Sequence, residues 1–400
     1  MTHLVQPALN ALSRWLNAFS LFVLASWCSS IAFGESFSRS VPKFGTPIVF
    51  SNALVFSAPV EGATLIIGID RQSGSKLWQM SVTNAGASVL TGLSEPILFS
   101  GGRLSTVSLN TGAITFRVDT EVTNAIVKSA VISSNRLLLH LEWGTDQLLM
   151  FDGAWSKRWH LQKVYRLLNH TATYALVEFA DREEVSGYSF GFTTNTLSLP
   201  KNRRIGLVDI ESGVVKWSLP VNESRNGVIL GEYVVLAGSG RIASLRVSDG
   251  SVDSRIEVAT DNSQAPIWTM QGSVYRGVSS NLLVQVSVPR LEQKVIAKLK
   301  EPPWLLFYGG QTQVDSVFIS HAFQRPVAYD LTTAQRLWPA TLPTLRLGYS
   351  DHFADWAGVH DGFIYTSEAR TVSARMFIKE IEVKTGKERE LFSMPMANNR

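Results

Sequence analysis

A short pattern that recurs along the whole chain constrains the fold most. Each copy joins an apolar, strand-like run to a polar turn, and a bulky apolar residue then opens a second run. The clearest copies span Ile67–Trp78 and Gly206–Trp217. Weaker copies lie at Val107–Phe116, Met150–Trp159, from Ala243 around Gly250, Gln285–Ile296, Ala328–Trp338 and Glu380–Leu391. Such self-similarity predicts a repeat architecture in which each unit packs on the next.

The spacing of the copies predicts the number and size of the units. Equivalent turn positions recur every 37 to 57 residues, and most steps match the roughly 40 to 50 residues of a four-stranded propeller blade. These positions are Asp70, Ser108, Asp152, Asp209, Arg246, Ser287, Asp330 and Glu382. The sequence therefore predicts an all-β fold: a single eight-bladed β-propeller of four-stranded antiparallel blades over residues 46–396, with a tail at 397–400.

Two steps are longer than the rest, and each contains a polar segment. Residues 181–204 predict a charged insertion that interrupts the fourth blade rather than building it. Residues 343–356 predict a long loop before the eighth blade. The entropic cost of a loop grows only slowly with its length, so a blade tolerates such segments.

The turn of each copy has the chemistry of a tight reversal between antiparallel strands. Glycine supplies a positive φ, and Asp, Asn, Ser or Thr side chains bond the turn backbone. The Trp or Phe after the turn is predicted to fill the gap between neighbouring blades, because a blade cannot bury both faces alone. The residues of this predicted structural motif are Asp70, Gly74, Trp78, Gly112, Phe116, Asp152, Trp159, Asp209, Gly213, Trp217, Gly250, Asp330, Trp338 and Gly386.

The first 34 residues predict a signal peptide. Leu16–Trp27 is a mostly apolar run, too short to span a bilayer comfortably, and one basic residue and no acidic residue precede it. Ala32 and Gly34 precede Glu35 as small residues precede a signal-peptidase cut. Residues 35–45 would then lead into the first blade. The alternative is a retained N-terminal anchor. The protein is expected to be exported, periplasmic or secreted, and to associate with a membrane only through a partner or that anchor.

The only cysteine, Cys28, lies inside the predicted signal peptide. A chain cut after Gly34 would have no cysteine for disulfides, metal thiolates or a nucleophile. The bulky Trp27 before Cys28 also disfavours lipidation of this cysteine. Of the 37 basic and 33 acidic residues, only Arg14 precedes Glu35, and this even balance does not indicate nucleic-acid binding.

The sequences 70–78 and 209–217 resemble the strand–turn–strand motif of the PQQ-repeat propellers, a run that ends in Leu-Asp-x-x-Thr-Gly-x-x-x-Trp. The resemblance covers about residues 46–396 and is weakest in the fifth and sixth blades. It implies either a quinone-dependent dehydrogenase or a non-catalytic scaffold similar to the BamB-like components of the outer-membrane β-barrel assembly machinery. Because BamB-like scaffolds are lipid-anchored, the disfavoured lipidation at Cys28 weakens the second, more specific implication.

The sequence offers few groups for catalysis. The dehydrogenase resemblance implies a calcium site, a catalytic Asp and, in many members, a disulfide between adjacent cysteines, but this chain is much shorter than those enzymes. Gly-x-Ser-x-Gly, His-Glu-x-x-His and Gly-x-x-x-x-Gly-Lys-Ser/Thr are absent from the sequence. The predicted innermost strands at 47–49, 88–90, 128–130, 228–230 and 267–269 supply one cation and no carboxylate. We therefore expect no catalytic residue and no cofactor.

Two polar segments are candidate binding sites. Asp351, His352, Asp355 and His360 carry imidazole and carboxylate groups that could hold a divalent metal. Their spacing matches no established motif, and a solvated loop between the seventh and eighth blades is the alternative. The basic run at 201–204 could recognise an acidic partner, or it could simply be solvated.

These observations favour a non-catalytic protein-binding scaffold of the cell envelope, by resemblance in outer-membrane protein assembly. A propeller displays many loops on a rigid frame, which suits protein binding. The expected partner is another envelope protein, and the propeller itself is expected to be monomeric. The alternative is a PQQ-dependent or other channel-site dehydrogenase, or a ligand-binding propeller. A sensor or secreted structural protein is a third reading.

Overall fold

In the computed structural model, Lys43–Arg400 form one compact unit. The structure describes residues 47–60, 62–83, 87–90, 94–122, 125–133, 135–142, 146–188, 194–221, 226–238, 240–258, 267–270, 272–278, 282–298, 312–314, 317–322, 325–330, 333, 335–338, 352–370 and 375–395. The predicted signal peptide at 1–34, the lead-in at 35–45 and the tail at 397–400 lie outside these residues.

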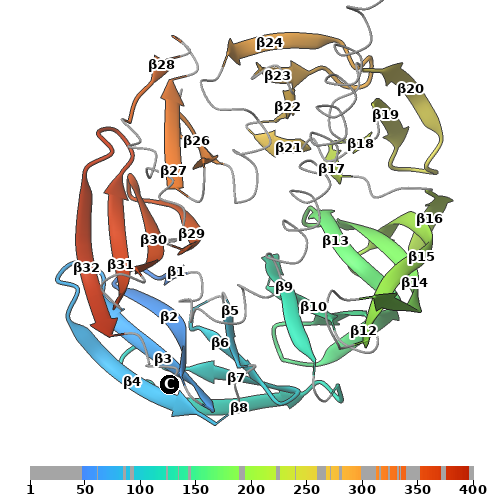
Figure 1. Cartoon of the computed structure of the whole chain (residues 1–400). Coiled ribbons are helices and arrows are strands. Elements are labelled where there is room, and N and C mark those ends of the chain that lie inside the picture. The colour runs from blue at the N-terminus through green and yellow to red at the C-terminus, as the bar shows by residue number, and fades with distance from the viewer. Residues whose placement is uncertain are drawn as a thin grey trace, which may run out of the picture. The chain divides into compact units, whose positions relative to one another are not determined.

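The described residues form eight four-stranded antiparallel sheets, and each sheet pairs four consecutive strands in chain order (Figure 1). The first four sheets comprise β1 (Ile48–Val49), β2 (Ala53–Val60), β3 (Ala63–Asp70), β4 (Lys76–Val82); β5 (Ser88–Leu90), β6 (Ile97–Ser100), β7 (Arg103–Val107), β8 (Ile114–Asp119); β9 (Ile126–Ser133), β10 (Arg136–Glu142), β11 (Gln147–Phe151), β12 (Lys157–Gln162); β13 (Val164–His170), β14 (Tyr174–Tyr188), β15 (Thr194–Asp209) and β16 (Val215–Pro220).

The last four sheets have the same composition. They comprise β17 (Asn226–Leu230), β18 (Tyr233–Gly238), β19 (Arg241–Arg246), β20 (Val252–Glu257); β21 (Ile267–Met270), β22 (Ser273–Val278), β23 (Leu282–Val286), β24 (Gln293–Lys298); β25 (Thr312–Val314), β26 (Val317–Ala322), β27 (Arg325–Asp330), β28 (Gln335–Arg336); β29 (His352–His360), β30 (Phe363–Arg370), β31 (Arg375–Glu382) and β32 (Glu388–Pro395). The fold is thus the predicted all-β, eight-bladed β-propeller.

The antiparallel order places the connections at two ends of the sheets. Hairpins between first and second strands, and between third and fourth strands, lie at one end, which we call the turn face. Hairpins between second and third strands, and the connections to the next sheet, lie at the other end, the crossover face. In Figure 1 the first strands, such as β9 and β29, lie toward the middle of the view, and the fourth strands, such as β12 and β32, lie at the outside.

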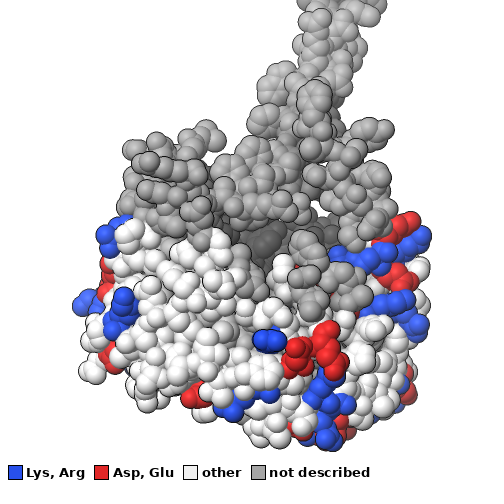
Figure 2. All heavy atoms as spheres, turned by 90° about the horizontal axis from the view of Figure 1, so that it is seen from below, with Lys and Arg blue, Asp and Glu red and all other residues white. Residues whose placement is uncertain are grey.

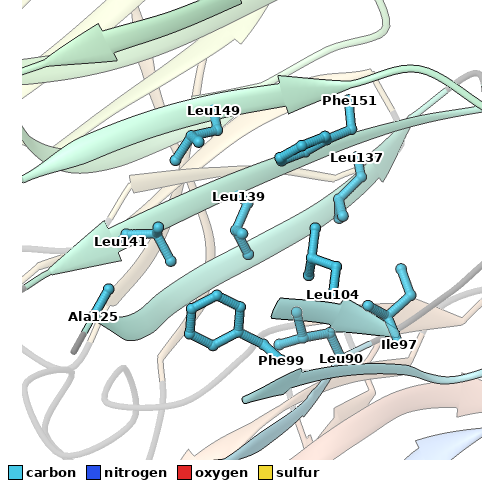
Figure 3. Close-up of a cluster of buried hydrophobic side chains, with 10 residues drawn as sticks. All are labelled: Leu90, Ile97, Phe99, Leu104, Ala125, Leu137, Leu139, Leu141, Leu149 and Phe151. Atoms are coloured by element: carbon cyan, nitrogen blue, oxygen red, sulfur yellow. The ribbon is translucent and has the colours of Figure 1, made fainter. Parts of the chain in front are cut away.

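Apolar side chains join neighbouring sheets. Figure 3 shows one such cluster, in which Phe99 and Leu104 of the second sheet face Leu137, Leu139 and Phe151 of the third. Burying one side chain of this size away from water adds about 1.5–3 kcal/mol to the free energy of unfolding. The first and last sheets also meet, because the ring centres of two phenylalanines, at 56 on β2 and 392 on β32, lie 5.7 Å apart.

The turns between third and fourth strands repeat the same two backbone hydrogen bonds. In the first sheet, the Gly74 amide donates to the Asp70 carbonyl and the Asp70 amide donates to the Ser75 carbonyl. The same pair of bonds occurs at Ser108, Asp209, Arg246, Ser287 and Glu382, all positions that the repeat aligns. The carboxylates of Asp70, Asp152 and Asp209 accept amides of their own turns. Asp330 lies at the end of β27 and pairs with β28.

Four tryptophans join one sheet to the next. The Trp78 indole N–H donates to the Leu109 carbonyl at 2.6 Å, and the ring lies so close to Gly112 that an added Cβ would come within 2.9 Å of it. The same arrangement recurs for Trp159 with Ile210 and Gly213, for Trp217 with Val247 and Gly250, and for Trp338 with Val383 and Gly386. Each acceptor lies three residues before a glycine of positive φ, so the turn presents a carbonyl to the indole and has no side chain in the way of the ring.

Phe116 does not take this role, although it occupies the equivalent sequence position. In the first sheet the β-bulge lies before Trp78, which therefore pairs with Gly68. In the second sheet the β-bulge lies after Phe116, farther from the turn, and Phe116 therefore pairs with Ser105. This one-residue shift turns the ring to the other side of the sheet. Phe116 is 57% exposed, with the Arg103 guanidinium 5.9 Å from the ring centre. The expectation that Phe116 fills an inter-blade gap is therefore corrected.

Residues 181–204 are mostly strand rather than an inserted loop. β14 and β15 are 15 and 16 residues long, and they pair along nearly their whole length. The predicted interruption of the fourth blade is therefore corrected to an extension of its central hairpin. The predicted loop at 343–356 also ends earlier than expected, because β29 begins at His352.

We expect Trp78→Ala or Trp217→Ala to reduce the free energy of unfolding by about 3–5 kcal/mol, because each truncation leaves a cavity between two sheets. Phe116→Ala is the matched control and should change it by less than about 0.5 kcal/mol, since the ring is exposed. Denaturant melts of the purified variants measure both effects. Tryptophan variants that melt like the wild type would contradict this packing.

Candidate functional site

The hairpin of β14 and β15 extends beyond the sheet to which it belongs. β13 pairs with β14 only as far as Phe179, and β16 pairs with β15 only from Arg204 onward. Farther out the two strands pair with each other alone, from Asp181 with Lys201 to Tyr188 with Thr194. We call residues 181–188 and 194–201 the hairpin extension. It projects at the crossover face, and in the pairings of the described residues both its outer edges are unpaired.

Charged side chains fix the base of the hairpin extension to the third sheet. Arg182 Nε and Nη2 donate to the two carboxylate oxygens of Asp146 at 2.7 and 2.6 Å. Arg182 Nη2 also donates to Glu142 at 3.3 Å, and Glu142 accepts from Lys128 at 2.7 Å. The Asp146 side chain is only 2% exposed. A bidentate pair this well shielded from water holds the two sheets together more strongly than a surface ion pair would.

Tyr165 and Glu178 form the other half of this cluster. The guanidinium groups of Arg182 and Arg203 lie 5.2 and 5.6 Å from the Tyr165 ring centre, within the range of cation–π attraction. Arg203 and Arg166 each approach a Glu178 oxygen at 3.4 Å. The base of the hairpin extension therefore has two features: an aromatic ring contacted by two cations, and a buried carboxylate paired with two cations.

The Glu178 side chain is fully buried, and burial raises the pKa of its carboxyl while Arg166 and Arg203 act in the opposite direction. Arg166 also donates to the Asn226 amide oxygen on β17 at 3.1 Å. The cluster thus spans the third, fourth and fifth sheets. No local sequence signal indicates these pairs, because partners such as Arg182 and Asp146 are 36 residues apart.

His140 on β10 lies beside this cluster and is also buried. Its Nε2–H donates to the Val164 carbonyl on β13 at 2.8 Å, which joins the third and fourth sheets. Burial lowers the pKa of the imidazole, whereas the Val164 carbonyl, Asp146 and Glu142 act in the opposite direction. The net effect lowers the pKa, so the fold favours the neutral ring.

The basic run at 201–204 is largely paired within the protein. Lys201 lies 3.2 Å from Glu183, and Arg203 pairs with Glu178 as described. Asn202 donates to Asp181, and Lys163 and Asn202 together hold the pKa of Asp181 below its usual range. Figure 2 shows basic and acidic side chains interspersed on one side of the molecule. Two cations of the predicted acidic-partner site are thus already neutralised.

The predicted metal ligands are spread along one strand. Asp351 lies outside the described residues, and β29 extends from His352 through Asp355 to His360. His352 pairs with Ala369 and His360 pairs with Phe363, six residues apart on β30. A strand rises about 3.3 Å per residue, so the backbones of the two histidines are about 20 Å apart, too far for both to bind one ion. His360 is exposed, and burial of its ring together with Arg71 lowers its pKa. Among the described residues, no three His, Cys, Asp or Glu side chains form a metal-binding group.

The predicted innermost segments do lie on first strands, namely β1, β5, β9, β17 and β21. The sequence-based selection missed β13, which adds Tyr165 and the cation Arg166. It also missed Glu178, which pairs with Arg166 from the second strand of the same sheet. Within the described part of the chain, no helix is long and apolar enough to cross a membrane.

Eight four-stranded sheets, with Trp–Gly contacts at four of the junctions between them, define a PQQ-like repeat propeller. A family model described as outer membrane protein assembly factor BamB matches residues 62–386, and the chain therefore belongs to this family. A comparison with curated proteins gives no match.

Solved structures share the fold at low sequence identity. BamB from Moraxella catarrhalis is 14% identical with a TM-score of 0.52, over 82% of this chain and 91% of that one. The computationally designed Ika8 protein is 13% identical with a TM-score of 0.55, over 87% and 96%. Apo AztD from Citrobacter koseri is 10% identical with a TM-score of 0.50, over 89% and 96%. At these identities the likeness shows the fold alone.

We expect His140→Gln to flatten the pH dependence of stability. The unfolded chain binds a proton near the ordinary histidine pKa of 6.5, whereas the pKa of the buried ring in the folded protein is lower. The contribution of His140 is therefore fully present above about pH 6.5 and is lost as the pH falls, by at most about 1.4 kcal/mol per pH unit. Denaturant melts between pH 7.5 and 5.5 measure the difference between wild type and variant. The exposed His160→Gln is the control, and equal profiles for wild type and His140→Gln would contradict this assignment.

Proposed function

We propose that this protein is an exported, non-catalytic scaffold of the cell envelope that binds another envelope protein in outer-membrane protein assembly. Membership of a family described by that assembly role supports the context. The observation that carries the proposal is the hairpin extension, which presents unpaired strand edges on a base fixed by the Arg182 cluster.

The partner that fits this site is an extended strand of another protein. Backbone N–H and C=O groups along an unpaired edge bind a further strand by main-chain hydrogen bonds. The β15 edge contains Pro200, which has no N–H to donate and makes that edge a poorer template. The β14 edge at 181–188 contains no proline. We therefore assign the partner strand to β14.

A fixed base favours such binding. A mobile hairpin would lose conformational entropy when a partner strand adds to it, which weakens association. Here Arg182 is held by Asp146 and Glu142, and Lys163 donates to Asp181 at 2.7 Å. The first residues of the docking edge are thus ordered before a partner arrives.

Replacing Glu183–Lys201 with a short Gly-Ser linker should leave the fold intact and abolish partner binding. The pairing from Tyr174 with Asp209 to Phe179 with Arg204 remains, and a surface loop tolerates this change. A photo-cross-linking residue at Glu184 should capture the envelope partner, and the same residue at Glu390 on β32 is the control. The melting temperature and the cross-linked product are measured. A truncated protein that is unfolded, or that still binds the same partner, would contradict the proposal.

The dehydrogenase alternative requires that the protein bind a quinone cofactor and oxidise a substrate. We expect neither submicromolar binding of pyrroloquinoline quinone with calcium nor dye-linked oxidation of alcohols or sugars. A quinone site needs cations for the carboxylates, a divalent ion at the reactive carbonyl and a base for the substrate hydroxyl. Calorimetric titration with quinone and calcium together, followed by a dye-linked screen, measures both. Tight binding with turnover would replace the scaffold proposal with the dehydrogenase.

A further inference from the structure

The junction between the second and third sheets contains a pocket of about 180 Å³ at the turn face. Its lining includes Glu95, Ile97, Arg117, Leu137 and Trp155. It lies at the opposite end of the sheets from the hairpin extension, so it is separate from the proposed docking site.

The first origin of this pocket is the displaced bulge of the second sheet. Trp78 stands over Gly68 and faces the next sheet, but the equivalent Phe116 faces the other way. Arg117 is the bulged residue, and its Nε donates to the Thr106 hydroxyl at 3.0 Å. A guanidinium group therefore lies where an indole fills four other junctions.

The second origin is the turn that faces Arg117 from the third sheet. This turn is one residue shorter than the turns that begin at Asp70, Ser108, Asp209, Arg246, Ser287 and Glu382, and Trp155 stands at φ +65°, where all of these except the Ser287 turn, which has Leu291, have glycine. A bulky residue in the left-handed region is unusual and costs about 1–3 kcal/mol. Its side chain packs against the cluster of Figure 3. Two independent departures from the repeat thus meet at one junction.

The lining combines an apolar floor with separate charges. Ile97 and Leu137 are 2% and 4% exposed and belong to the cluster of Figure 3. A second guanidinium in the lining, at Arg136, pairs with Glu211, and a second carboxylate, at Asp152, accepts the amides of its own turn. Within the part of the chain that the structure describes, Arg117 has no carboxylate partner and Glu95 has no cationic partner. The pocket thus offers one uncommitted cation and one uncommitted anion above an apolar surface.

We propose that this pocket binds the α-carboxylate of an apolar amino-acid residue. The carboxylate lies on the Arg117 guanidinium, the adjacent N–H group faces Glu95, and the side chain packs on Ile97, Leu137 and the Trp155 ring. Drug-sized ligands need about 300 Å³ or more, so a pocket of this volume suits one residue. That residue is either a free amino acid, whose nitrogen is a charged ammonium, or the carboxyl terminus of a polypeptide, whose nitrogen is a neutral amide; both present an α-carboxylate, an N–H donor and an apolar side chain.

The experiment is an NMR titration of the purified full-length protein with three probes: L-leucine, the peptide N-acetyl-Gly-Gly-Leu, and the same peptide with a carboxyl-terminal amide. We expect a carboxylate probe to bind with a Kd of about 0.1–1 mM and the amide to bind at least about 10-fold more weakly. Tighter binding of leucine identifies the free amino acid as the ligand, and tighter binding of the peptide acid identifies a chain terminus.

Variants separate this site from non-specific attraction. Arg117→Met should weaken binding of the carboxylate probe at least about 10-fold, because it keeps the stem and removes the charge. Trp155→Gly should abolish binding while the protein stays folded, since glycine suits the left-handed turn. Arg103→Met on β7 removes the same charge outside the pocket lining and should leave binding unchanged. The proposal is overturned if no carboxylate probe binds, if the amide binds as well as the acid, or if Arg103→Met weakens binding as much as Arg117→Met.

Discussion

The hydrogen bond from an indole N–H to a carbonyl of the next sheet is the interaction that orients four pairs of neighbouring sheets. Apolar packing between two sheets is strong but non-directional. The indole adds direction, because its N–H reaches only the carbonyl three residues before the turn glycine, and the glycine leaves room for the ring. Where this contact is lacking, as between the second and third sheets, the junction is free to acquire polar side chains.

The two ends of the sheets carry different chemistry. At the crossover face, Arg182 pairs with Asp146 and Arg203 pairs with Glu178, and these pairs fix a strand edge in place. At the turn face, Arg117 and Glu95 retain theirs beside an apolar floor. The proposed strand-docking edge and the proposed carboxylate pocket therefore lie at opposite ends of the sheets, so neither has to move for the other to be occupied.

The sequence was sufficient for the repeat, the number of blades and the turn register, because these follow from short-range patterns such as Asp70-x-x-Ser73-Gly74. It failed where tertiary pairing decides the outcome. Phe116 has the right type and spacing, yet a bulge two residues farther along β8 than the equivalent bulge of β4 reverses its side. The charges at 181–204 indicated polarity but not that they continue two strands, and the partners of Arg182 and Glu178 lie too far apart in sequence to be recognised locally. The separation of His352 from His360 required knowing that β29 is extended.

The contact between the first and last sheets has a consequence for synthesis. Arg71 pairs with Asp361, and Arg389 donates to the Gln72 carbonyl across 317 residues of chain. The side of the first sheet on which Phe56 contacts Phe392 therefore stays uncovered until β32, the last strand, has been synthesised. Contacts this distant in sequence slow folding, because the closure entropy must be overcome before they form. For nearly the whole time that the chain emerges, its first sheet exposes an apolar side that only its last can cover.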